Sequence, residues 1–463
     1  MKKLLLAFAL ITAVAHAQVT LLAVGSLTQS KAGTYADLSG LPGTLENGAP
    51  ANLLGGLGSG FAYASGNTFL GLPDRGPNAV SYDSAVDDTV SYIPRFHTIT
   101  MDLKPNTSST GLPFTLTPTL RRTTLLWSLI PLAYGTGDGL GVGSGVPAQN
   151  NFFFHFFSGR SDNFDPNQNS GNPRDARLDS EGIRVSNDGL TVFVSDEYGP
   201  YVYQFDRLTG LRLRAFKLPD NLFSPILRPV GADEISLNTT GRTANKGMEG
   251  LAITPDGKTL VGMMQAALIQ DNLQGGAAKS LLRIVTIDIR TGKTHEYAYL
   301  LTTGSGVSEI VALNQHEFLV DERDGKGRGD GSKAKIKQIF KIDLANAVDV
   351  TEMDGLTAAG NAVSKTLFLD VVASLTAPST SMDPKQIPAK LEGLALGPDV
   401  WNGTTKLHTL WIANDNDFLS AVDDGSGTGS TFDNPNQFFV FGFTDADLAG
   451  SVLVPQQFRR FDW

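Results

Sequence analysis

The chain of 463 residues contains no cysteine and only six histidines. Without cysteine there can be no disulfide, no thiolate-bound metal and no lipidated thiol, so a large core must hold the fold together. The scarcity of histidine, added to the lack of cysteine, argues against zinc, which favours these two ligands. No stretch after the N-terminal segment reaches the length of a membrane helix, and we therefore expect no membrane span.

Positive charge is also scarce, since 37 lysines and arginines face 47 aspartates and glutamates, for a formal net charge of −10. This balance argues against nucleic acid or anionic lipid as a partner and is compatible with divalent cations. The sequence has no Gly-x-Ser-x-Gly nucleophile elbow, no P-loop and no dinucleotide fingerprint. Serine esterases of the hydrolase type and the common nucleotide-binding enzymes are therefore disfavoured.

The N-terminus has the pattern of a secretory signal peptide over residues 1–17. Lys2 and Lys3 precede an apolar run over residues 4–14, and Ala15-His16-Ala17 supplies small residues for cleavage before Gln18. We therefore predict an exported protein, either periplasmic or extracellular.

The chain is rich in glycine (50 residues), proline (23) and phenylalanine (26), which suits many short strands joined by tight turns. Four similar segments begin with a glutamate and continue as a short apolar run: Glu181-Gly182-Ile183, Glu249-Gly250-Leu251, Glu309-Ile310-Val311 and Glu392-Gly393-Leu394. A fifth, Ser59-Gly60-Phe61, lacks the acid. Such repetition predicts an array of similar sheets whose repeated acids meet in space.

Each repeat is followed by further strand-like runs and Asp-Gly or Thr-Gly turns, giving four strands a unit. The fold class is therefore all-β, and we predict a single β-propeller over residues 18–463. The last unit stops after its third strand, so the N-terminal run 19–24 should complete it and close the ring. The repeats count five blades; residues 127–178 are either an insertion or an irregular sixth blade, and we expect their aromatic run 152–157 to pack against the barrel.

Carboxylates recur at a fixed distance from the repeated acids. Glu181 and Asp196 are 15 residues apart, as are Ser59 and Asp74, which fits an antiparallel hairpin that places the start of one strand beside the end of the next. Because first strands line the channel of a propeller, we predict an acidic rim at one channel mouth, centred on the Glu181 blade. Its members are Glu181, Glu249, Glu309 and Glu392, surrounded by Asp74, Asp196, Glu197, Glu322 and Asp415, with Arg75, Arg323, Lys246 and Lys390 close by.

So many carboxylates can be ionised together only if positive charge lies among them. Oxygen ligands in irregular number suit Ca²⁺, and a Ca²⁺ cluster flanked by arginine and lysine would bind phosphate oxygens and could activate a water. Alternatively, each glutamate could only bridge to backbone N–H groups of the neighbouring blade, as a structural latch. Both interpretations stay open for any single glutamate, and the group of Glu181, Asp196 and Glu197 favours a site.

Several motifs together resemble the phytase-like family, also called "esterase-like activity of phytase". They are Asp179-Ser180-Glu181-Gly182-Ile183, Val194-Ser195-Asp196-Glu197-Tyr198, Leu72-Pro73-Asp74-Arg75-Gly76, Asn245-Lys246-Gly247-Met248-Glu249, and Lys390-Leu391-Glu392 with Asn414-Asp415-Asn416. The resemblance covers about residues 56–443, and the segment 127–177 departs from it. It implies a β-propeller and suggests phosphoester hydrolysis.

We therefore predict an exported, monomeric, Ca²⁺-dependent hydrolase of small phosphoesters. The ion would be held by Glu181, Glu249, Glu392, Asp196 and Glu197, and the catalytic group would comprise Glu181, Glu197, Arg75, Arg323 and Lys246. One alternative is a non-catalytic propeller that binds a metal or a ligand. The other is a surface scaffold that uses the 127–178 insertion to meet a partner.

Overall fold

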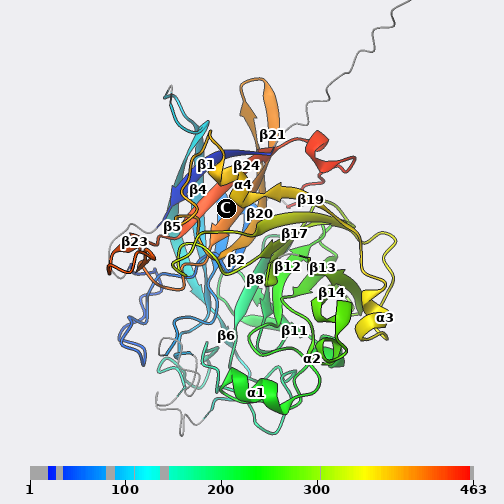
Figure 1. Cartoon of the computed structure of the whole chain (residues 1–463). Helices are drawn as coiled ribbons and strands as arrows, with labels where there is room; N and C mark the ends of the chain where they lie inside the picture. The colour runs from blue at the N-terminus through cyan, green and yellow to red at the C-terminus, as the bar shows by residue number, and fades with distance from the viewer. Residues whose placement is uncertain are drawn as a thin grey trace, which may run out of the picture.

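Five four-stranded antiparallel sheets, arranged as the blades of a propeller, make up the computed structural model (Figure 1). The structure describes residues 19–27, 35–79, 89–108, 110–135, 145–302 and 304–458. The predicted signal peptide, residues 1–17, lies outside these ranges. Within them, no helix has both the length and the apolar character needed to cross a membrane.

The blades follow one another along the chain, each running from an inner to an outer strand. The first blade contains β2 (Gly60–Ser65), β3 (Thr68–Leu72), β4 (Arg95–Pro105) and β5 (Phe114–Leu125), and the second contains β8 (Ser180–Val185), β9 (Thr191–Asp196), β10 (Val202–Asp206) and β11 (Arg212–Phe216). The third contains β12 (Met248–Ile253), β13 (Thr259–Met264), β14 (Leu281–Asp288) and β15 (Thr294–Leu300). The fourth contains β16 (Gly306–Ala312), β17 (Glu317–Arg323), β18 (Lys337–Asp343) and β19 (Lys365–Asp370).

The fifth blade joins the two ends of the chain. It contains β20 (Leu391–Asn402), β21 (Thr405–Asn414) and β24 (Gln437–Phe443), and its outer strand is β1 (Thr20–Ser26). β1 pairs with β24 from Thr20 opposite Gly442 to Ser26 opposite Gln437, and the two lie side by side in Figure 1. The predicted closure by the N-terminal strand is therefore confirmed.

The segment from 127 to 178 is an insertion and adds no sixth blade. In its described part the strands are β6 (Trp127–Ser128) and β7 (His155–Phe156), which pair with each other, and Trp127 also forms a single parallel bridge to Leu211. Phe157 packs in the core, where it contacts Tyr203 and Phe205, as expected for the aromatic run. Phe152 and Phe153 instead lie on the surface, 86% and 62% exposed. The run is thus divided between the core and the solvent.

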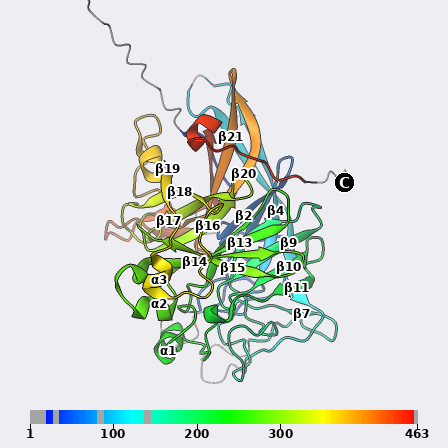
Figure 2. The same ribbon diagram turned by 90° about the vertical axis from the view of Figure 1, so that its right-hand side faces the viewer.

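Short helices and a small hairpin occupy the connections. They are α1 (Gly231–Leu237), α2 (Ile269–Leu273), α3 (Gly355–Ala359), α4 (Val371–Thr376), three short 3₁₀ turns (Asp220–Leu222, Gly276–Ser280, Asp445–Leu448) and the hairpin β22 (Ala421–Asp423) with β23 (Thr431–Asp433). Figure 2 shows α2 and α3 side by side near α1. The helices are additions to an all-β core.

The five inner strands, β2, β8, β12, β16 and β20, contact one another in a closed ring around the axis. Four of them carry glycine where the next strand comes close. A Cβ atom at Gly60 would lie 2.2 Å from the carbonyl oxygen of Glu181, and one at Gly182 would lie 2.7 Å from Cβ of Leu251. The Glu-Gly pair of the repeats therefore serves two purposes: its glycine permits a narrow ring, and its glutamate begins the channel wall.

Candidate metal centre at the channel mouth

The repeated glutamates all lie at irregular points of their strand pairs. The register between inner and second strands shifts between Ser180 and Ile183, between Met248 and Gly250, between Val307 and Glu309, and between Leu391 and Gly393. A bulge inserts an unpaired residue, bends the strand and re-aims a side chain, and such bulges are frequent beside active sites. Glu181, Glu249 and Glu392 are therefore unpaired at the bulges of their inner strands, whereas in β16 the unpaired residue is Ser308 and Glu309 pairs with Asp321.

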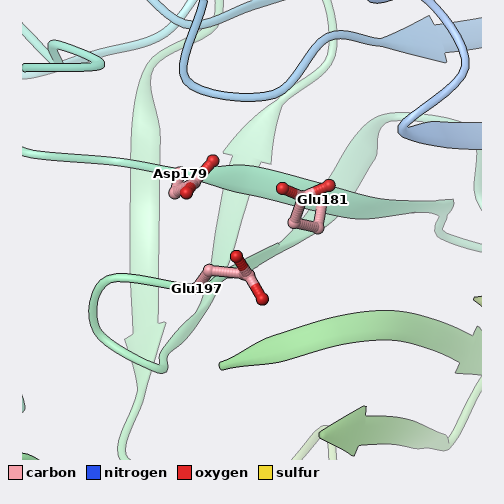
Figure 3. Close-up of side chains that lie close together, drawn as sticks. All are labelled: Asp179, Glu181 and Glu197. Carbon is pink, nitrogen blue, oxygen red and sulfur yellow. The ribbon is translucent and has the colours of Figure 1, made fainter. Parts of the chain in front are cut away.

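Three carboxylates of the second blade form the tightest group. One carboxylate oxygen from each of Asp179, Glu181 and Glu197 lies within 4.8 Å of the others, and all three residues are buried. Figure 3 shows Asp179 just before β8, Glu181 on β8, and Glu197 on the loop that follows β9. The group lies on the second blade, the Glu181 blade on which the sequence analysis centred the predicted acidic rim.

Of the three carboxylates, that of Glu181 has the fewest groups nearby that could stabilise its negative charge. Its carboxylate has no hydrogen-bond donor and no ion-pair partner within the described part of the chain. Burial, and then the charges of Glu249, Asp179 and Glu197, hold its pKa well above the ordinary value. The site therefore disfavours a bare carboxylate here and would favour a cation or a proton.

Glu197 faces the carboxyl group of Glu249 on the third blade, within hydrogen-bond reach. Burial, and then the charge of Asp179, raises the pKa of Glu197 to about 7, while burial and the charge of Glu197 hold the pKa of Glu249 well above its usual range. Oε1 of Glu197 and Oε2 of Glu249 are buried, and neither has a hydrogen-bond partner among the residues that the structure describes. Two facing carboxyl groups with unused oxygens require a proton or a cation between them.

Asp179 is the member of this group that our sequence analysis did not assign to the site. Its Oδ1 accepts the backbone N–H of Arg75 at 3.1 Å, and its Oδ2 pairs with Nη1 of Arg75 at 3.0 Å. The same Nη1 donates to Oδ1 of Asn245 at 2.5 Å. The signal was present in Asp179-Ser180-Glu181, since residues two apart in an extended segment point to the same side.

Asp196 holds the turn after β9 together. Its Oδ1 accepts the backbone N–H groups of Asp179 at 3.1 Å and Tyr198 at 3.0 Å, and its Oδ2 accepts that of Gly199 at 3.0 Å. Burial raises its pKa to about 7, although these hydrogen bonds lower it. Asp196 thereby orients both Asp179 and the segment that carries Glu197.

The first, fourth and fifth blades add two ion pairs and one further acid to the mouth. Arg323 pairs with Glu392 and donates from Nε to Oγ of Ser308 at 2.6 Å. Nζ of Lys390 lies 2.8 Å from Oδ2 of Asp415. Burial raises the pKa of the neighbouring Asp74 to about 6, against the opposing charges of Arg75 and Lys390. Arg323, Lys390 and Arg75 therefore bring positive charge to the rim, and each of these side chains lies next to a carboxylate.

Glu309 adopts the latch arrangement instead. Its Oε1 accepts the backbone N–H of Leu251 in the neighbouring blade at 2.8 Å, and its Oε2 lies 3.1 Å from Nη2 of Arg184. Arg184 also donates to the carbonyl oxygens of Phe61 and Ile310, at 2.9 and 2.8 Å. Glu309 therefore ties blades together inside the channel and lies outside the tightest group.

Two other residues from the predicted site lie apart from this group. The carboxylate of Glu322 contacts the hydroxyl of Tyr299 and Nζ of Lys365, both from outer strands of blades. Lys246 is exposed and makes no ion pair with any described residue. Glu322 thus packs between blades, whereas Lys246 stands free beside Asn245 at the mouth.

The donor set at the mouth fits a hard divalent cation. Asp179, Glu181, Glu197 and Glu249 offer only carboxylate oxygens, which Ca²⁺ accepts in irregular number. The unpartnered buried oxygens of Glu197 and Glu249 are the observation that supports the fit. Burial is the main cause of the high pKa values of Glu181, Glu197 and Glu249, and an ion there would offset the second cause, the repulsion among the carboxylates.

Comparison with known proteins gives the same family. The family model described as "Phytase-like: Esterase-like activity of phytase" matches residues 52–418. A protein of Arthroderma benhamiae, described as an uncharacterized secreted protein, is 38% identical over 177 residues, covering 32% of this chain and 34% of that relative. The chain thus matches about a third of that relative's length.

Solved structures with likeness to this chain include a periplasmic gluconolactonase of Pseudomonas aeruginosa, at 14% identity and a TM-score of 0.32, covering 91% of this chain and 99% of that one. A putative 6-phosphogluconolactonase of Bacteroides uniformis is 13% identical with a TM-score of 0.30, covering 88% and 98%. Likeness at this level carries no inference about activity.

Proposed function

Because this chain belongs to the phytase-like family, described as "esterase-like activity of phytase", we propose that it is an exported hydrolase of phosphoesters that depends on a divalent cation, with Ca²⁺ as the ion. The substrate is a small phosphoester, and the enzyme acts as a monomer.

One observation carries the proposal. Four carboxyl groups from two blades converge at one end of the channel, and two of them keep buried oxygens without a partner. Burying ionised groups in this way costs free energy unless a positive ligand compensates. The arrangement is therefore expensive for a purely structural role and suitable for a bound cation.

The chain's own residues would have distinct tasks. Asp179, Glu181, Glu197 and Glu249 would hold the ion, and Asp196 would keep Asp179 and Glu197 in place through its backbone hydrogen bonds. Arg75 and the exposed Lys246 would hold phosphate oxygens. When bound, Ca²⁺ would supply positive charge to the phosphate and lower the pKa of a water. In the overall reaction, water oxygen bonds to phosphorus, the ester P–O bond breaks, and a proton goes to the leaving oxygen.

Export is supported from two directions. The N-terminal pattern of residues 1–17 is that of a signal peptide, and the matched protein of Arthroderma benhamiae is described as secreted. The proposal places the enzyme in the periplasm or outside the cell.

The test is phosphate release from phytate and from p-nitrophenyl phosphate, measured with Ca²⁺ and with a chelator. We expect turnover with Ca²⁺ that the chelator removes. The double substitution Glu181→Gln, Glu197→Gln should lower turnover by at least about 10- to 100-fold, the range found when groups that support a metal site are removed.

Glu352→Gln is the control, because it makes the same glutamate-to-glutamine change once, at an exposed position far along the chain. It should leave turnover unchanged. If purified protein binds Ca²⁺ yet shows no turnover above the double variant, the non-catalytic metal-binding propeller replaces this proposal.

A further inference from the structure

Next to the acidic group lies a pocket of opposite charge. Four arginines line it, Arg75, Arg177, Arg228 and Arg242, together with Tyr198 and Asn245, around a small cavity of about 20 Å³. Arg75 belongs to both places, since its Nη1 lies 3.0 Å from Oδ2 of Asp179. The pocket therefore borders the candidate metal centre directly.

The four arginines of the pocket come from separate connecting segments of the chain. Arg75 follows β3, and Arg177 ends the insertion just before β8. Arg228 and Arg242 flank α1, in the connection between β11 and β12. A basic cluster assembled from three distant segments differs from a local run of solvated charges, because each segment must be held in place for the charges to meet.

The positive charge of the pocket is not balanced by its acids. Glu234 is the acidic residue in the lining, and it pairs with Arg242 at 2.8 Å and with Arg177 at 3.5 Å. Arg228 is exposed, and within the described part of the chain its Nη1 donates only to the carbonyl oxygen of Leu227, at 2.8 Å. One carboxylate thus faces three guanidinium groups, which leaves a net positive site.

Two of the arginines also hold unused buried donors. Among the described residues, Nη1 of Arg242 and Nε of Arg177 have no hydrogen-bond acceptor, and Nη2 of Arg177 has only the 3.5 Å ion pair with Glu234, although the two arginines are only 1% and 2% exposed. The Arg242 side chain is fixed, since its Nε and Nη2 donate to the carbonyl oxygen of Tyr198 at 3.0 and 2.8 Å. Buried N–H donors without an acceptor are costly, and an anion with several oxygens would satisfy them.

We propose that this pocket binds a tetrahedral oxyanion, either free phosphate or the terminal phosphate group of an ester. Guanidinium groups match the geometry of phosphate oxygens, and Arg228 is placed to complete the shell from the solvent side. Binding here requires neither turnover nor a cation in the acidic group, so the two proposals can fail separately.

The test uses the full chain after chelator treatment, with calorimetric titration of inorganic phosphate at constant ionic strength. We expect saturable binding that Arg228→Gln weakens by about tenfold, equivalent to ~1.4 kcal/mol. Arg228 suits this test because its exposed side chain has no carboxylate partner to leave behind. Arg290→Gln, an exposed arginine in the turn between β14 and β15, removes the same charge and should leave the affinity unchanged.

Arg242→Lys is the second variant, because it keeps the charge but loses the fixed fork, and it should also weaken phosphate binding if the variant folds. Titration with a phosphomonoester distinguishes the source: mutual competition means that both ligands share the pocket, and binding of the ester alone assigns it to substrate. Absence of binding for both ligands, or equal affinity of Arg228→Gln and Arg290→Gln, overturns the proposal.

Discussion

Two aspartates of the second blade have different tasks although they lie beside each other. The carboxylate of Asp196 accepts hydrogen bonds from three backbone N–H groups. The carboxylate of Asp179 instead pairs with Arg75 and lies close to those of Glu181 and Glu197. An acid that binds its own turn contributes to folding, and an acid that faces other acids contributes to ligand binding.

This contrast gives a prediction about metal dependence. Ca²⁺ should raise the melting temperature of the wild type, because an ion that binds only the native state stabilises it. Asp179→Asn should remove most of that increase. Asp196→Asn should lower the melting temperature by a similar amount with and without Ca²⁺, through about 1–3 kcal/mol of lost hydrogen bonding.

Calorimetry in Ca²⁺ and in chelator, on both variants, separates the two roles. An Asp196→Asn variant with normal stability but no response to Ca²⁺ would instead make Asp196 a ligand.

The repeats were sufficient to locate Glu181, Glu197 and Glu249 at one channel mouth, because register follows from hairpin spacing. They could not separate Glu309 from Glu249, since both begin the same motif. The difference comes from Arg184 of another blade, which pairs with Glu309. The arginine pocket could not be predicted from the sequence either, because its residues lie in connections between strands, and no periodic pattern specifies the paths of these connections.

Among elements, the inner strands are the most constrained by backbone proximity. Gly60→Ala would place a Cβ atom 2.2 Å from the carbonyl oxygen of Glu181, so β2 and β8 would have to separate. We expect a loss of about 1–3 kcal/mol in the free energy of unfolding, the usual cost of overpacking a close contact. Denaturant unfolding of the purified variant measures it.

Gly325→Ala is the matched control, because no atom lies within 4 Å of its added Cβ and its backbone is not left-handed. It should change stability by no more than about 0.5 kcal/mol. Equal stability of the two variants would mean that the inner ring can widen without cost.

Strand boundaries were largely predictable, because turn residues mark them. The N-terminal run 19–24, expected to complete the last blade, forms β1 over Thr20–Ser26. The insertion was not predictable in this way. Its short strands β6 and β7 pair across 26 residues, and the exposure of Phe152 and Phe153 beside the buried Phe157 follows from no pattern in the run.

On the scale of the molecule, many carboxyl groups are buried in a folded state that favours their protonated form. Burial raises the pKa of Glu296 to about 7 and that of Asp175 to about 6, in addition to the groups at the mouth. Because the folded state then binds more protons than the unfolded state, stability is highest near pH 4–5 and falls as pH rises toward 8.

We therefore expect metal-free protein to lose about 3 kcal/mol or more between pH 5 and pH 8, at about 1.4 kcal/mol for each pKa unit and group. Glu296→Gln should reduce this slope, because the neutral amide no longer titrates. Added Ca²⁺ should restore stability at pH 8 and have little effect at pH 5. Denaturant midpoints in chelator across this range measure the slope, and a flat or rising curve would contradict the expectation.

The pairing of β1 with β24 also determines when the molecule can be completed. Thr20 must meet Gly442, so this contact has a very high sequence separation and cannot form until almost the whole chain has been synthesised. Closing so long a loop costs little more than closing a moderate one, about 0.6 kcal/mol for each doubling in length, but high contact order slows folding. Until then β1 and β21 lack the strand that pairs with both of them, and each presents an unpaired edge to other chains. A chain truncated before Gln437 would therefore be an aggregation hazard rather than a smaller working propeller.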